Sequence, residues 1–128
     1  NLPLNGLLLM IKIKRIYDSS GDEDGCRVLV DRLWPRGLSK ESARVDVWMK
    51  EIAPSAILRK WFCHDTEKWE EFTKLYTREL TENRQMLLEI KRLEKEHKTV
   101  TLLYASKDTE HNQAQVLYRE LKKIEASE

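Results

Sequence analysis

Four short segments of the chain have the hydrophobic pattern of β-strands. Residues 10–17 alternate between apolar and polar side chains, which is the period-two signature of a strand with one exposed face. Residues 26–33 and 98–104 each contain a run of aliphatic side chains, as expected of a buried strand. A fourth, shorter strand is predicted within residues 45–49.

Between these segments, apolar residues recur at the three- and four-residue spacings of amphipathic helices. A short helix is predicted over residues 39–44, and a second, with a proline in its first turn, over residues 54–63. From Thr66 a longer stripe continues past a predicted break near Asn83, so two helices are expected there. Asp108 is predicted to cap a last helix.

Strands interleaved with helices predict an α/β fold, a single three-layer domain with a small, mostly parallel sheet flanked by helices. A chain of 128 residues has the length of one domain. Residues 1–9 have no basic residue and are too short for a signal peptide or a membrane span. We expect them to be a leader or a cloning remnant, followed by the domain at residues 10–128.

Charge and cysteine content narrow the class of partner. The 23 basic and 22 acidic residues leave a net charge of +1, so no global field recruits nucleic acid or an anionic membrane. Cys26 and Cys63 lie far apart without C-x-x-C spacing, which excludes the usual zinc knuckle and favours a reducing compartment. We expect a cytoplasmic monomer or small homo-oligomer with no membrane partner.

Candidate chemistry follows two of the predicted strands. In open α/β sheets, ligands bind beyond the carboxyl ends of the strands, so the residues that follow each strand are the candidates. The first set, after the second strand, is Asp31, Arg32, Trp34 and Arg36. The second set, at the end of the last strand, is Tyr104, Lys107, Asp108, His111 and Asn112. If the two strands are neighbours, both sets line one crevice.

The basic residues of these sets favour an anionic small molecule, such as a phosphate or a carboxylate. Arg32, Arg36 and Lys107 would add donors to the free backbone N–H groups expected at the start of the helix after Asp108. The alternative is that an arginine forms a structural salt bridge with Asp31 or Asp108, and this alternative stays open.

His111 and Asp31 are the candidate catalytic groups. His111 lies three residues before Ala114, which predicts that its ring is on the inner face of the last helix, near its start. A helix N-terminus disfavours the imidazolium, so the ring would stay neutral and able to accept a proton. A packed histidine satisfied by a backbone carbonyl is the alternative.

Three further residues have two readings each. His64 is a further candidate for ligand binding, and with Asp65 it forms either a second acid/base pair or, together with His111, a set of metal ligands. An Asp at a helix end more often simply caps the next helix. Cys63 lacks an orienting partner and is expected to be a small core residue. Trp34 either stacks on a base or sugar or covers the core. No ligand spacing supports a metal site, and no cofactor is implied.

Three ordered motifs resemble a known family. They are VLVDRLWPRGLSK at residues 28–40, LRKWF before His64-Asp65, and LLYASKD followed by EHN near the last strand. Together they resemble the YeaO-like proteins of the large domain-of-unknown-function family 488. The resemblance implies an α/β fold with these residues near the strand ends, and no established substrate.

This chain differs from the pattern of the family it resembles at two places. More distant relatives carry a Cys-His-Arg triplet after the last strand, where this chain has Asn112, Gln113 and Ala114, which argues against thiol or metal chemistry at that position. Relatives tend to have Gly in place of Cys63. A methyltransferase label attached to some members is rejected because the chain has no glycine-rich methyl-donor site.

Three functions remain. The first is an enzyme acting on a phosphorylated or carboxylated small molecule, for example a nucleotide, with His111 or Asp31 transferring protons. The second is a non-catalytic ligand-binding or interaction module that uses the same residues. The third, nucleic-acid binding through Trp34 and the arginines, is disfavoured by the near-neutral charge.

Overall fold

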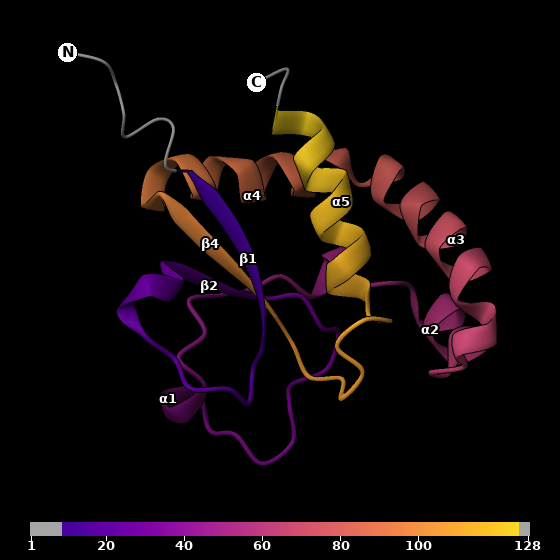
Figure 1. Cartoon of the computed structure of the whole chain (residues 1–128), viewed down its shortest axis with the longest axis horizontal. Helices are drawn as coiled ribbons and strands as arrows, with labels where there is room; N and C mark the ends of the chain where they lie inside the picture. The colour runs from indigo at the N-terminus through magenta and orange to yellow at the C-terminus, as the bar shows by residue number, and fades with distance from the viewer. Residues whose placement is uncertain (1–8, 126–128) are drawn as a thin grey trace.

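A four-stranded parallel sheet forms the centre of the computed structural model, which describes residues 9–125 (Figure 1). The strands are β1 (Met10–Arg15), β2 (Cys26–Leu29), β3 (Val47–Trp48) and β4 (Thr99–Tyr104). Their order is β1-β4-β2-β3, and every pair is parallel. The predicted α/β fold with a small parallel sheet is confirmed. Of the predicted leader, residues 1–8 lie outside the described residues.

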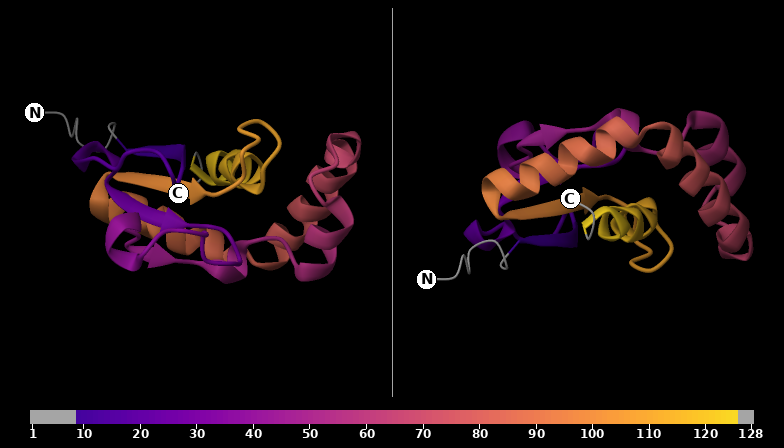
Figure 2. Two further views of the ribbon diagram at one scale, coloured as in Figure 1. Left: turned by 90° about the horizontal axis from the view of Figure 1, so that it is seen from below. Right: turned by 90° about the horizontal axis from the view of Figure 1, so that it is seen from above.

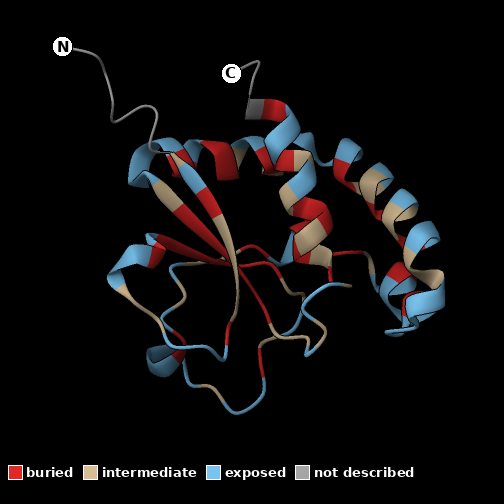
Figure 3. Cartoon of the chain, in the orientation of Figure 1, coloured by how far each residue is buried: buried red, intermediate tan, exposed pale blue. Residues whose placement is uncertain are grey.

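One face of the sheet is covered by two long helices, α4 (Arg84–His97) and α5 (Gln113–Glu125). A third long helix, α3 (Trp69–Glu82), packs against α4 and α5. Val28 of β2 aligns with Leu102 of β4, and both belong to the core that contains the inner stripes of these helices. Figure 3 shows the buried residues along the strands and the inner sides of α4 and α5. Within the described part of the chain, no helix has the length and apolar character needed to cross a membrane.

The predicted break near Asn83 separates α3 from α4. The Asn83 N–H donates to the carbonyl oxygens of Glu79 and Leu80, at 3.1 and 3.0 Å, and so closes α3. The helix predicted from Thr66 begins instead as the 3-10 turn η4 (Thr66–Lys68), because the Asp65 side chain caps that turn through the Glu67 N–H. The α-helix follows at Trp69.

The helix α2 (Ala56–Phe62) begins at the N-cap Ser55, whose Oγ accepts from the Leu58 N–H at 3.2 Å. It ends at two consecutive left-handed residues, Cys63 (φ 45°) and His64 (φ 60°). Both views in Figure 2 place α2 and the start of α3 side by side at one end of the molecule, away from the strands. A further 3-10 turn, η3 (Lys50–Ile52), precedes α2.

The other face of the sheet carries a short helix, turns and a buried ionic cluster. Here lie α1 (Lys40–Ala43), capped by Ser39 as predicted, and the 3-10 turn η2 (Asp22–Asp24). The fully buried Asp24 pairs with Arg27 Nη1 at 2.6 Å and Lys14 Nζ at 3.0 Å. Burial would raise the pKa of Asp24, but the hydrogen bonds from Lys14 and Arg27 outweigh it and lower that pKa. These charges therefore hold β1 and β2 to the η2 turn.

Candidate functional site

A cleft of about 620 Å³ opens beyond the carboxyl ends of the strands. Its walls come from the loop at residues 31–36, the backbone at 53–54, the end of α2 at 59–64 and the loop at 105–113. Because β2 and β4 are neighbours, the segments that follow them meet here, as predicted from the sequence.

Asp31 joins the loop at residues 31–36 to the loop at residues 105–113 and to β3. Its Oδ2 accepts from the Ala105 N–H at 2.9 Å, its Oδ1 accepts from the side-chain amide of Gln113, and its carbonyl oxygen accepts from Trp48 Nε1 at 2.8 Å. Burial raises the pKa of the Asp31 carboxyl to about 6, against the opposing effect of these hydrogen bonds and of nearby Arg59. Both carboxylate oxygens are thus already engaged in holding the site together.

Four basic side chains line the cleft. Arg32 is held by the backbone, its Nε donating to the Pro54 carbonyl at 3.2 Å and its Nη2 to the Ala53 carbonyl at 3.1 Å. Arg36, Arg59 and Lys60 are exposed in the cleft wall.

Among the described residues, none of these four side chains forms an ion pair with a carboxylate. The alternative of a structural salt bridge from Arg32 or Arg36 to Asp31 or Asp108 is therefore wrong. Arg59 and Lys60 were not predicted as site residues, although the LRKWF motif contains both.

His111 is held by Asp108 in the loop that precedes α5. Its Nδ1 lies 3.0 Å from Asp108 Oδ2, and its ring meets Trp69 edge-on with centroids 5.2 Å apart. Asp108 Oδ1 also accepts the backbone N–H groups of Glu110 and His111, each at 2.9 Å, and these bonds lower the pKa of Asp108. The Nε2 atom of His111 is the ring nitrogen left for a ligand.

The predicted helix cap at Asp108 is wrong, because Asp108 instead closes a turn on the two N–H groups that follow it. The helix α5 begins at Gln113, and the Asn112 Oδ1 caps it by accepting from the Gln115 N–H at 3.2 Å. The N–H groups of Glu110 and His111, which were expected to be free for an anion, are thus bound to Asp108. His111 also lies before the helix and not on its inner face.

The cleft contains seven of the ten residues predicted for the site. They are Asp31, Arg32, Trp34, Arg36, His64, His111 and Asn112. Three lie outside its lining: Tyr104 is buried in the core, Lys107 is exposed, and Asp108 reaches the site through His111. Trp34 covers the core as well as lining the cleft, since its Nε1 donates to the Leu38 carbonyl at 2.7 Å and its ring packs against Trp48.

Cys63 and His64 form the turn at the end of α2. Cys63 is exposed and lines the cleft, so its predicted place in the core is wrong. The cause is its left-handed conformation, which turns the chain away from α2 just after the buried Phe62. Across the described residues, no three His, Cys, Asp or Glu side chains are grouped in a way that would hold a metal ion.

The positions of the distant relatives' Cys-His-Arg triplet are used structurally in this chain. Asn112 caps α5 and donates from Nδ2 to the Asp108 carbonyl at 2.9 Å, and Gln113 binds Asp31. Ala114 is fully buried in the core. These three positions brace the cleft and present no nucleophile to it.

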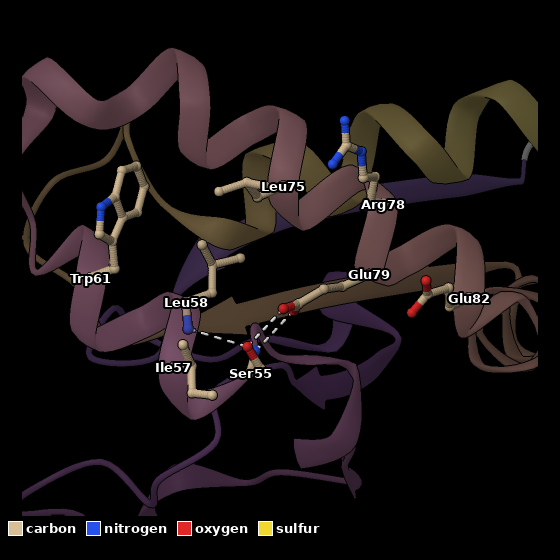
Figure 4. A pocket seen from close by; sticks show the side chains of 8 residues that line it. All are labelled: Ser55, Ile57, Leu58, Trp61, Leu75, Arg78, Glu79 and Glu82. Atoms are coloured by element: carbon tan, nitrogen blue, oxygen red, sulfur yellow. Dashed lines mark hydrogen bonds between the residues drawn. The ribbon is translucent and has the colours of Figure 1, made fainter.

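A second hollow, of about 430 Å³, lies between α2 and α3 (Figure 4). Ile57 and Trp61 extend from α2 and Leu75 from α3 along this groove. The carboxylate of Glu79 is occupied, accepting from the Ser55 N–H at 2.9 Å and the Ser55 hydroxyl at 2.7 Å. The walls of this second hollow are mainly apolar, so the strand-end cleft remains the candidate site for chemistry.

Comparisons with known proteins agree on one group of relatives. A family model described as the inactive DUF488-N3 subclade matches residues 10–128. The uncharacterized protein YeaO of Escherichia coli is 42% identical over 107 residues, which are 84% of this chain and 92% of YeaO. The uncharacterized protein Rv3073c of Mycobacterium tuberculosis is 44% identical over 70 residues, 55% of this chain and 59% of that protein. The match thus spans 59% of the mycobacterial relative's length. No solved structure matches the chain.

Proposed function

The chain belongs to the family described as the inactive DUF488-N3 subclade, and from this premise we propose that it binds a small anionic molecule in the strand-end cleft without turning it over. The observation that carries the proposal is the charge of the cleft. Arg32, Arg36, Arg59 and Lys60 line it against a single carboxylate, that of Asp31, among the described residues. Because the whole chain is nearly neutral, this concentration of positive charge is local.

The arrangement of the arginines favours phosphate or carboxylate as the anion. Arg32 is already oriented by two backbone carbonyls, so less side-chain freedom is lost when its remaining N–H groups bind a ligand. The turn that carries Arg36 is held by the Tyr17 hydroxyl, which donates to the Arg36 carbonyl at 2.9 Å. Guanidinium groups bind such oxyanions through paired N–H donors.

Binding without turnover is favoured because several polar groups of the cleft are already hydrogen-bonded within the protein. Both Asp31 oxygens accept hydrogen bonds from the protein, and Asn112 and Gln113 serve as a helix cap and as the Asp31 partner. The description of the subclade as inactive agrees with this reading.

A thermal-shift titration with inorganic phosphate, pyrophosphate and citrate tests the proposal. A ligand that binds only the folded state raises the midpoint of unfolding. We expect a rise for the unmodified chain that is lost in Arg36→Ala and Arg59→Ala. Arg119→Ala is the matched control, because it removes the same charge from an exposed position outside the cleft. No rise with any anion, or equal rises in all variants, would contradict the proposal.

Proton transfer by His111 is the second candidate function. The Asp108 carboxylate orients the imidazole through Nδ1 at 3.0 Å, the arrangement that leaves Nε2 to act as a base toward a bound ligand. Phosphorus NMR of phosphate esters incubated with the protein discriminates between the two functions. Product that accumulates with the unmodified chain and not with His111→Gln would support catalysis; unchanged spectra would support binding alone.

We further propose that the protein works in the cytoplasm. Both cysteines, the buried Cys26 and the exposed Cys63, are free thiols in the structure, which suits a reducing compartment. Fractionation of cells that express the tagged chain, with a periplasmic and a cytoplasmic marker, tests this assignment.

A further inference from the structure

One wall of the cleft is built from aromatic rings. Phe62 of α2 and Phe72 of α3 stack with ring centroids 4.4 Å apart, and Trp69 stacks on Phe72 at 5.5 Å. A histidine ring lies at each end of this series, His64 at 6.4 Å from Phe62 and His111 at 5.2 Å from Trp69. All of these rings except that of Trp69 line the cleft.

The two histidines are the members of this aromatic wall that a ligand can reach. Phe62 and Phe72 are buried and form its base, whereas His64 is exposed and His111 is half-buried. An imidazole presents a flat face for stacking and ring nitrogens for hydrogen bonds at its edge. A planar ring with polar edges suits this wall better than an aliphatic chain does.

Two of the basic side chains lie on the same helix as this wall, and a third is bound to the backbone just before that helix. Arg59 and Lys60 precede Phe62 on α2, and Arg32 is bound to the Ala53 and Pro54 carbonyls just before that helix. The cleft therefore combines an aromatic part with an anion-binding part. Its volume, about 620 Å³, lies in the range of sites that hold small organic ligands.

We infer that the ligand of the cleft is a nucleoside phosphate, with its base against the His64 and His111 rings and its phosphate at Arg32, Arg36, Arg59 and Lys60. This inference rests on the proposed function, because it uses the same cleft and the same arginines. It adds that the base contributes to affinity and that the anion alone is a weak ligand. No covalent step is involved.

Isothermal titration with ADP, AMP, adenosine, ribose 5-phosphate and pyrophosphate tests the inference. ADP or AMP is expected to bind at least tenfold more tightly than ribose 5-phosphate or pyrophosphate, because base stacking adds to the anion contacts. Adenosine is expected to bind more weakly than AMP, because it lacks the phosphate.

A variant of His64 separates the base contact from the anion contact. His64→Asn removes the ring, and Asn tolerates the left-handed backbone at this position, so the fold is kept. We expect it to lose most of the advantage of AMP over ribose 5-phosphate while pyrophosphate binding is unchanged. His97→Asn removes an exposed histidine outside the cleft and is the matched control, and circular dichroism checks folding.

The outcomes distinguish the two levels of the proposal. If ribose 5-phosphate or pyrophosphate binds as tightly as the nucleotides, the nucleotide inference is overturned while the anion site survives. If no anion binds, the proposed function itself fails. Tighter binding of a single-stranded oligonucleotide than of any mononucleotide would overturn the inference in favour of nucleic-acid recognition.

Discussion

The side-chain amide of Gln113 donates a hydrogen bond to the carboxylate of Asp31 and so fixes the first residue of α5 to the end of β2. The other oxygen of the same carboxylate accepts from the Ala105 N–H at 2.9 Å, just after β4. One half-buried acid thus sets the relative position of the segments that form the base of the cleft. Its titration is accordingly linked to the stability of this edge of the sheet.

Stability should fall as the pH rises through the titration of Asp31. Burial raises the pKa of this carboxyl to about 6, so the folded chain holds the proton more tightly than the unfolded chain does. The resulting stabilisation is full below the pKa of an ordinary Asp, about 4, and is lost as the pH rises through about 6. Asp31→Asn removes this dependence.

Urea denaturation of both proteins between pH 4.5 and 7.5 measures the effect. Relative to Asp31→Asn, the free energy of unfolding of the unmodified chain should decrease by on the order of 1–2 kcal/mol across this range. All other titrating groups are common to both proteins and cancel in the difference. Two parallel pH profiles would show that Asp31 does not titrate in this window.

Removal of Arg27 should be strongly destabilising. Arg27 is 4% exposed and donates to Asp24 as well as to the Ala43 and Arg44 carbonyls. Arg27→Met would remove the cation closest to the fully buried Asp24 and lower the free energy of unfolding by roughly 3 kcal/mol or more, although Lys14 and the Gly21 N–H still contact the carboxylate.

Arg92→Met is the matched control for Arg27→Met. Arg92 also pairs with carboxylates, those of Glu89 and Glu96, but its side chain is 59% exposed, so Arg92→Met should lower the free energy of unfolding far less than Arg27→Met does. Chemical denaturation of both variants tests the difference. Equal losses of unfolding free energy in the two variants would mean that burial does not determine how much these ion pairs contribute to stability.

Cys63→Gly should stabilise the protein. Cys63 has φ 45°, in the left-handed region that disfavours a residue with a Cβ atom. Glycine relieves that strain, but its greater conformational freedom in the unfolded chain offsets part of the effect. The free energy of unfolding should therefore increase by about 0.5–1 kcal/mol. Cys63→Ala retains the Cβ and is the control. A Gly variant that melts no higher than the Ala variant would be inconsistent with strain at this turn.

Tyr76→Phe tests the bond that ties α3 to the turn before α2. The fully buried Tyr76 hydroxyl donates to the Ile52 carbonyl at 2.7 Å, and without it that carbonyl loses this partner inside the protein. We expect a loss of roughly 1–2 kcal/mol by denaturant titration. Tyr118→Phe should change stability little, because its hydroxyl makes no hydrogen bond among the described residues.

The strands and long helices were predictable because their patterns are local and strong. The inner stripes of α3 and α4 match the residues that the structure buries, whereas in β1 only Ile11 is buried and the four residues after it are all half-buried. The start of α5 was not predictable in this way. Asp108 has the residue type of an N-cap, but its carboxylate is used in a turn that also orients His111, and Asn112 takes the cap.

The candidate site was predictable mainly where it depends on the strand ends. Asp31, Arg32 and His111 follow neighbouring strands, so the rule that ligands bind beyond carboxyl ends brings them together. Arg59 and Lys60, which were not predicted, come from α2, and their position depends on how α2 packs against α3. That packing involves contacts distant in sequence, and no local pattern encodes it.

The central position of β4 bears on how the chain folds as it leaves the ribosome. Among the described strands, β1 pairs with β4 alone and β2 is joined to β1 only through β4, although β4 follows both of them in the sequence. A nascent chain that ends within α4 therefore lacks the strand that lies between β1 and β2. The edges of β1 and β2 that later pair with β4 have no hydrogen-bond partner until β4 is made. Such long-range closure slows folding and lengthens the period in which a chaperone can bind.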